Sequence, residues 1–249
     1  MTSGDTEARL GESQWLDRLD DASALRVMLE SQAEAMTAIE PALPRIETAI
    51  TAMVARLADG DGRIIYAGAG SAIRIGVQDG VELRPTFNWP RARVDYLVAG
   101  GPGALMDAVE NAEDDSAAVA AAVSSMDIGP ADTVLAISAS GKTAFTCAVA
   151  AAAGIAGALT IGIFNNADAP LADDVEIGIP LITGAEAVAG STRLKAGTAQ
   201  KACLNMISTL VMTRLGFVRD GQMIAMQPSN AKLRARFETI HVGDCGRDS

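Results

Sequence analysis

The chain contains a single histidine, His241, close to its C-terminal end. This excludes a Ser-His-Asp triad and any site with several histidine ligands, so proton transfer in an enzyme of this sequence would use carboxylates. The three cysteines, Cys147, Cys203 and Cys245, lie far apart and show no CxxC spacing. They indicate buried or free thiols in a reducing cytoplasm rather than disulfides or a metal site.

Basic residues are outnumbered, because 20 lysines and arginines face 31 acidic residues and the net charge is −11. Such a chain is a poor nucleic-acid binder, since phosphate backbones require stripes of lysine and arginine. No apolar run reaches the roughly 18 residues that span a bilayer, and no signal-peptide pattern opens the chain. The sequence therefore predicts a cytoplasmic protein that binds neither nucleic acid nor membrane.

Aromatic residues make up only 4% of the chain, whereas 49% of its residues are hydrophobic. The core must be built from Ala, Val, Ile, Leu and Met, which favours helices packed closely on a sheet. After residue 62, short apolar segments alternate with helix-like ones, and this alternation predicts a parallel sheet covered on both faces. The expected strands are 63–67, 94–99, 133–138, 159–164 and 175–179. The expected helices are 72–83, 103–111, 116–125, 143–154, 167–173 and 198–215.

The first 58 residues predict an extension that packs on this sheet domain. Residues 1–20 are polar and form an arm, while 23–57 have a helical pattern with Pro44 suited to a first helical turn. We expect a three-layer α/β/α sandwich at 59–240, with a mostly parallel five-stranded sheet and an N-terminal helical extension. Residues 241–249 are expected to form a flexible tail.

Two turns rich in small and hydroxyl residues follow expected strands: 68–71 (GAGS) and 138–143 (SASGKT). In a parallel sheet both lie at the carboxyl edge and lead into helix N-termini, which attract anions. The first turn matches a dinucleotide fingerprint poorly because Ile73 replaces its third glycine, and the second matches a P-loop poorly because Ala136 replaces its upstream glycine. Two hydroxyl-rich turns on one edge fit a compact phosphate better, with two ordinary tight turns as the alternative. The candidate ligands are Gly70, Ser71, Ser138, Ser140, Gly141, Lys142 and Thr143.

A third segment, 190–201 (GSTRLKAGTAQK), places hydroxyl, cationic and glycine residues just before the last apolar helix. It is either a capped helix start with a solvated face, or a loop shaped around an anion or a neighbouring subunit. Its candidate ligands are Ser191, Thr192, Arg193 and Lys195. Glu82, in DGVELRPTF, lies at the end of the expected helix 72–83, and Glu113, in ENAEDD, comes just after another expected helix. Each alone is typical of a surface charge.

In chain order, the segments GRIIYAGAGS, RPTF, AVENAEDD, SASGKT, ALTIGI and GSTRLKAGTAQKACLNMIST resemble the N-acetylmuramic acid 6-phosphate etherases, which have the sugar isomerase (SIS) fold. The resemblance runs from Thr6 to about Arg236, and the family's small C-terminal helical domain is expected to be absent. It implies cleavage of the lactyl ether of N-acetylmuramate 6-phosphate to N-acetylglucosamine 6-phosphate and D-lactate. By motif position, Glu82 matches the family's acid and Glu113 its base. It also implies a homodimer with the site near the subunit interface, and no metal or cofactor.

The first turn departs from the family pattern at Ala72, where serine is usual, and at Ile73, where glycine is usual. We expect these changes to remove one hydroxyl donor and to narrow the turn. Two alternatives therefore stay open: an SIS isomerase acting on another sugar phosphate, and a non-catalytic regulator that senses a sugar phosphate.

Overall fold

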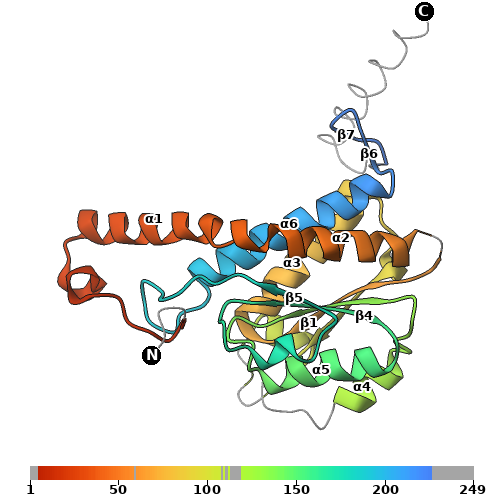
Figure 1. Ribbon diagram of the computed structural model, residues 1–249, viewed down its shortest axis with the longest axis horizontal. Helices are drawn as coiled ribbons and strands as arrows, with labels where there is room; N and C mark the ends of the chain where they lie inside the picture. Colours follow the sequence, from red (N-terminus) through yellow and green to blue (C-terminus); the bar gives the residue numbers. More distant parts are fainter. Residues whose placement is uncertain (1–4, 59, 108, 110–111, 113–118, 226–249) are drawn as a thin grey trace, which may run out of the picture.

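The structure is a computed structural model that describes residues 5–58, 60–107, 109, 112 and 119–225. Five strands form one sheet, in the order β2-β1-β3-β4-β5, and every pairing is parallel. The strands are β1 (Ile64–Gly68), β2 (Val94–Val98), β3 (Thr133–Ile137), β4 (Leu159–Phe164) and β5 (Ile177–Pro180). Helices cover both faces of this sheet, which confirms the predicted three-layer α/β/α sandwich (Figure 1).

The helices divide between the two faces of the sheet. One face carries α2 (Leu43–Leu57), α3 (Gly70–Phe87) and α6 (Lys195–Arg214), and the other carries α4 (Val119–Ser125) and α5 (Ala144–Ile155). Helix α1 (Asp21–Thr37) packs on α6 and extends beyond the sheet in Figure 1. The remaining described elements are the 3-10 turns η1 (Glu12–Gln14), η2 (Leu16–Arg18), η3 (Glu40–Ala42), η4 (Arg91–Arg93), η5 (Pro102–Leu105) and η6 (Pro170–Ala172), and a hairpin of β6 (Val218–Arg219) and β7 (Gln222–Met223).

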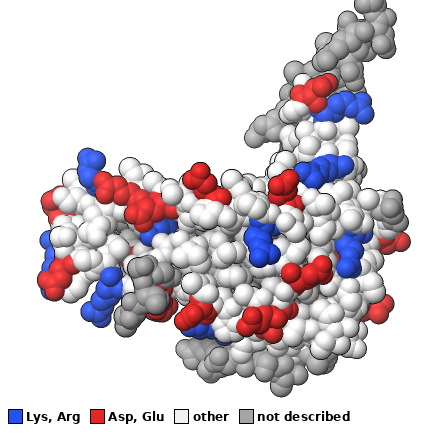
Figure 2. All heavy atoms as spheres, in the orientation of Figure 1, with Lys and Arg blue, Asp and Glu red and all other residues white. Residues whose placement is uncertain are grey.

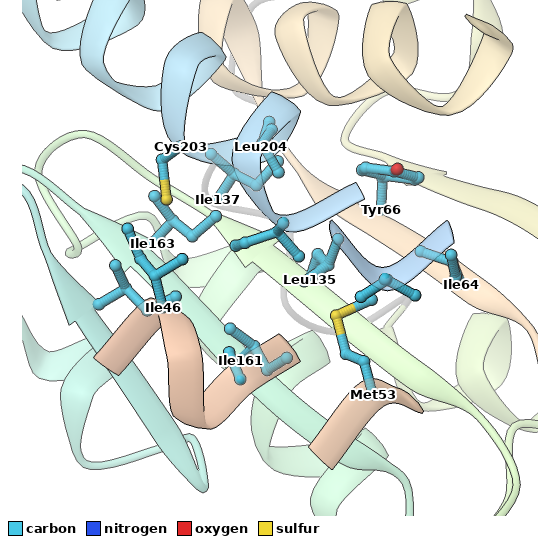
Figure 3. Packing of buried hydrophobic residues seen from close by; sticks show 14 of the residues in the cluster. Ile46, Met53, Ile64, Tyr66, Leu135, Ile137, Ile161, Ile163, Cys203 and Leu204 are labelled. Atoms are coloured by element: carbon cyan, nitrogen blue, oxygen red, sulfur yellow. The ribbon is translucent and has the colours of Figure 1, made fainter. Parts of the chain in front are cut away.

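The main core lies between the sheet and the layer of α2, α3 and α6. Figure 3 shows Ile46 and Met53 of α2, and Cys203 and Leu204 of α6, facing apolar side chains of the strands. Strands β1, β3 and β4 are buried along their whole length, as expected for parallel strands covered on both faces. Each large aliphatic side chain buried here stabilises the fold by roughly 1.5–3 kcal/mol.

Two predicted helices are wrong. The described part of 103–111 contains only the 3-10 turn η5, which follows Gly100 and Gly101, both with positive φ angles. The segment 167–173 contains only η6, because its backbone is used elsewhere: the Leu171 N–H donates to the Gly141 carbonyl over 3.0 Å. Helices this short are only marginally stable on their own. The turn at the two glycines and the hydrogen bond to Gly141 therefore decide the local backbone conformation.

Helix α3 runs four residues past its predicted end, straight through Pro85. Proline removes one backbone donor, but in the last turn this costs only one hydrogen bond, and its fixed φ is compatible with a helix. The helix ends instead at Asn88, which adopts a left-handed conformation and donates its N–H to the Arg84 carbonyl. The extra turn keeps Glu82 inside a regular helix.

Charged side chains of both signs are interspersed over the face of the molecule drawn in Figure 2. Within the described ranges, no helix combines the length and apolarity needed to cross a membrane.

The sheet reverses its winding direction between β1 and β3. The chain leaves β1 through α3 toward β2, and it leaves β3 through α5 toward β4, on the opposite side. Helices α3 and α5 therefore lie on opposite faces, with their N-termini flanking one gap at the carboxyl edge. In open α/β sheets, ligands bind at such a point.

Candidate functional site

The first turn, Gly68 to Ser71, brings β1 against β3 and then starts α3. A Cβ atom at Gly68 would lie 2.6 Å from the Ile137 carbonyl oxygen, and Gly70 has a φ of 55°, so both positions require glycine. Ser71 follows in the first turn of α3 and is half-buried. The Ile73 side chain is 1% exposed and packs in the main core, while its Cβ lies beside the turn, 3.5 Å from where a Cβ atom at Gly68 would be.

The second turn, Ser138 to Thr143, is held by its own hydroxyl groups. The buried Ser138 Oγ accepts the Gly141 N–H at 3.0 Å and lies 2.9 Å from Thr143 Oγ1. Ser140 Oγ accepts the Lys142 N–H at 3.1 Å. The Lys142 side chain is exposed and makes no hydrogen bond or ion pair with a described residue. The hydroxyls thus shape the turn, while the ammonium group is available at its mouth.

Two helices, α3 and α5, begin at this edge, and their N-termini are not capped by side chains. Ala69 precedes α3 and Thr143 precedes α5, and neither residue caps its helix with a side chain, since the Thr143 hydroxyl is turned to Ser138. Backbone N–H groups in the first turns of α3 and α5 therefore have no side-chain acceptor among the described residues. Helix N-termini of this kind attract anions through these groups and through the helix dipole.

The N-terminus of α6 is different, because Glu186 fills it. The Glu186 side chain is 1% exposed, and its two carboxylate oxygens accept the N–H groups of Lys195 and Ala196 at 2.9 and 2.8 Å. This is the capped helix start that the sequence allowed as one interpretation of 190–201. Residues Ser191, Thr192 and Arg193 lie in the loop between Glu186 and α6, with the Arg193 side chain exposed.

Replacing Glu186 with alanine is expected to lower the free energy of unfolding by about 2–3 kcal/mol, because two buried N–H groups lose their acceptor. Urea unfolding followed by circular dichroism measures this change. Glu176→Ala is the matched control, since it removes an exposed carboxylate and is expected to change stability by less than about 0.5 kcal/mol. Equal stability of the Glu186→Ala and Glu176→Ala proteins would show that the cap is not stabilising.

Lys195 was expected to bind phosphate, but its ammonium group points to α1. Its side chain is 3% exposed, and Nζ lies 2.7 Å from Glu34 Oε2. The pair joins the start of α6 to α1, so this lysine links two helices. Its role toward a ligand stays a prediction, as do those of Ser191, Thr192 and Arg193.

The two predicted catalytic carboxylates are not brought together by the described residues. Glu82 is exposed on α3, eleven residues after Ser71, and a helix rising 1.5 Å per residue separates them by about 16 Å. Glu113 lies outside the described residues. Within one chain, Glu82 is therefore remote from the two turns.

One helical turn before Glu82, the buried Asp79 joins three elements. Its carboxylate accepts hydrogen bonds from Tyr66 of β1 at 2.8 Å, and from Asn205 and Ser208 of α6 at 2.7 and 3.0 Å. Burial, together with the neighbouring Asp79 charge, raises the pKa of the Tyr66 phenol well above its usual value, so it stays a donor. This network holds the helix that carries Ser71 and Glu82, and no local sequence pattern revealed it.

The described thiols are unreactive, in agreement with the prediction of buried or free cysteines. Cys203 is buried and Cys147 half-buried, and neither forms a disulfide. Burial raises their thiol pKa values to about 12 and about 11, so both stay protonated at neutral pH. Cys245 and His241 lie outside the described residues.

Comparison with known proteins agrees with this architecture. The family model described as "Glucokinase regulatory protein N-terminal SIS domain" matches residues 45–160. A phosphoheptose isomerase from Francisella tularensis shares the fold, with a TM-score of 0.54 and 18% identity, over 77% of this chain and 96% of that one.

Curated relatives are much more similar in sequence. The N-acetylmuramic acid 6-phosphate etherase of Deinococcus radiodurans is 42% identical over 94% of this chain and 76% of its own length. The enzyme of the same name from Rubrobacter xylanophilus is 44% identical over 94% of this chain and 78% of its own length. Identity of this level over nearly the whole chain shows that the protein belongs to the N-acetylmuramic acid 6-phosphate etherase family.

Proposed function

We propose that the protein is a lyase that cleaves the D-lactyl ether of N-acetylmuramic acid 6-phosphate. Water is consumed, and N-acetylglucosamine 6-phosphate and D-lactate are released, as in the recycling of cell-wall amino sugars. The observation that carries this proposal is the 42–44% identity to etherases over 94% of the chain. The enzyme works in the cytoplasm and requires no metal or cofactor.

The open N-termini of α3 and α5 support binding of the 6-phosphate at the gap between β1 and β3. Their unbonded N–H groups and the hydroxyls of Ser71, Ser140 and Thr143 supply donors, and Lys142 adds a positive charge. Ala72 removes only one hydroxyl from this set, and the Ile73 side chain packs in the core. The remaining donors support a retained phosphate site.

The chemistry requires one base and one acid. In the open-chain sugar the aldehyde makes the C2 proton acidic, and Glu113 removes it. The bond between C3 and the lactyl oxygen then breaks, with Glu82 donating a proton to the departing lactate. Water adds to C3 of the resulting unsaturated aldehyde and completes the product. Positioned carboxylates accelerate each such proton transfer by roughly 10²–10⁴-fold.

A second subunit is needed to complete the site. Glu82 lies about 16 Å along α3 from Ser71, farther than the carbon chain of one sugar phosphate reaches. Val81, next to Glu82 on α3, is apolar but 56% exposed. We infer a homodimer in which the exposed face of α3 that carries Val81 and Glu82 brings Glu82 of one subunit to the turns of the other.

The test is release of D-lactate from N-acetylmuramate with and without its 6-phosphate. We expect lactate and N-acetylglucosamine 6-phosphate in equal amounts from the phosphorylated sugar, and roughly tenfold or more lower kcat/KM without the phosphate, because the charged donors then lose their partner. Absence of lactate at high enzyme concentration would overturn the substrate assignment. Solvent deuterium at C2 of other sugar phosphates without lactate would point to an isomerase instead.

A further inference from the structure

The N-terminal arm is fastened to the carboxyl edge of the sheet through Thr6. This residue is 0% exposed, and its N–H donates to Asn166 Oδ1 at 3.0 Å while its hydroxyl accepts from Asn166 Nδ2 at 3.2 Å. Its carbonyl accepts the Gly190 N–H at 3.0 Å. Asn166 follows β4, the strand next to β3, so the arm lies one strand away from the second phosphate turn.

Beyond Thr6 the arm stays against the loop that leads to α6 (Figure 1). Arg9, Leu10 and Trp15 face residues 186–189 across a cavity of about 470 Å³. The Trp15 indole donates to the Leu10 carbonyl at 3.0 Å, and Arg18 lies over its ring. The arm is therefore an ordered part of this edge.

Gly190 brings the Glu7 carboxylate onto this loop. Gly190 has a φ of 73°, and a Cβ atom there would lie only 2.7 Å from Glu7 Oε2, so any other residue would displace the carboxylate. Glu7 is exposed, and its carboxylate has no hydrogen-bond or ion-pair partner among the described residues. The neighbouring Glu186 carboxylate already accepts two backbone N–H groups of α6. Of these two carboxylates, only that of Glu7 has no hydrogen-bond partner among the described residues.

We propose that Glu7 is a substrate-binding residue that accepts hydrogen bonds from the sugar hydroxyls. A carboxylate only accepts hydrogen bonds, hydroxyl groups donate them, and such charge-assisted bonds are about twice as strong as neutral ones. The phosphate is assigned to the gap between β1 and β3, and the arm that carries Glu7 is fastened after β4, one strand beyond β3. On this assignment, the carbon chain of the sugar runs from the gap toward Glu7. This assignment rests on the proposed sugar-phosphate substrate.

The test compares Glu7→Gln and Glu7→Ala with Glu12→Gln, which removes another exposed carboxylate of the same arm that pairs with Arg18. Steady-state kinetics of lactate release are measured on N-acetylmuramate 6-phosphate and on analogues that each lack one hydroxyl. We expect KM to rise about 10–100-fold in both Glu7 variants, with a smaller change in kcat, and to stay within about twofold in Glu12→Gln. One analogue lacks the hydroxyl that Glu7 binds. For this analogue, wild type and Glu7→Ala should have equal KM, because neither can form the hydrogen bond.

Two results would overturn the assignment: unchanged KM in both Glu7 variants, or an equal KM increase for every analogue, which would indicate a structural role of the arm. If the wild-type protein releases no lactate, the proposed function fails, and calorimetric binding of N-acetylglucosamine 6-phosphate decides the role of Glu7 separately. Weaker binding by Glu7→Ala than by Glu12→Gln supports the assignment in that case, and equal binding rejects it.

Discussion

Replacing Glu82 with glutamine is expected to lower kcat for lactate release by roughly 10²–10⁴-fold, the loss typical of a positioned general acid. The free energy of unfolding should change by less than about 0.5 kcal/mol, because the side chain is exposed and has no partner among the described residues. Steady-state kinetics and urea unfolding measure the two effects. Full activity of Glu82→Gln would remove this residue from the mechanism.

Glu113→Gln provides the comparison that separates acid from base. Without the base, exchange of the C2 proton with deuterated solvent should stop together with turnover. Without the acid, in Glu82→Gln, C2 exchange should persist while ether cleavage slows. The reverse pattern would exchange the two roles.

Mixed dimers test whether Glu82 serves the partner subunit. Ser71→Asp places a carboxylate at the start of α3, where it repels phosphate but favours the helix N-terminus. Ser71→Asp and Glu82→Gln are the two variants that are mixed, and each alone should be inactive. In a mixed dimer, the Ser71→Asp chain supplies an intact Glu82 to the intact turns of its partner, so an exchanged equimolar mixture should recover about a quarter of the wild-type activity. No recovery would place Glu82 at the turns of its own chain.

Asp79→Ala is expected to cause the largest loss of stability, about 3–5 kcal/mol in the free energy of unfolding. The substitution leaves the fully buried Tyr66 hydroxyl and the Ser208 hydroxyl without their acceptor, and each unsatisfied buried group costs about 1–3 kcal/mol. It also opens a small void between α3 and α6. Urea unfolding at neutral pH measures the loss.

Glu82→Ala is the matched control for this measurement, since it removes an exposed carboxylate from the same helix three residues away. Asp79→Asn keeps an acceptor oxygen in place and should lose less, about 1–2 kcal/mol. A loss below about 1 kcal/mol in Asp79→Ala would mean that the three donors find other partners.

The architecture could be read from local patterns because every strand of the sheet is a short apolar segment. The segment predicted as 159–164 matches β4 residue for residue, and the other strands shift by one or two residues. Helix boundaries were less predictable where one residue decides them: the left-handed Asn88 ends α3, although Pro85 was the stronger signal in the sequence. The segment 167–173 failed for a long-range reason, its bond to Gly141.

The candidate site was predicted where its parts are local, and missed where they are distant. Turns and helix starts form within a few residues, so Gly70, Ser71 and the turn 138–143 could be found from spacing. Glu186 caps a helix that begins nine residues later, and Glu34 reaches Lys195 across 161 positions. Such pairings join residues that are distant in the sequence, so local patterns do not reveal them. The burial of Ile73 also depends on distant elements and could not be predicted locally.

The contact between Thr6 and Asn166 also has a consequence for the order of folding steps. It closes a loop of 160 residues, and loop closure costs more entropy as the loop lengthens, so this contact gains little until the sheet is already in place. On a ribosome the arm is made before β4, but it has nothing to dock on until β4 and the loop to Gly190 have been made. Docking of the segment that carries Glu7 therefore belongs to the last stage of folding, and we expect the helices to form before this proposed sugar-binding carboxylate is in place.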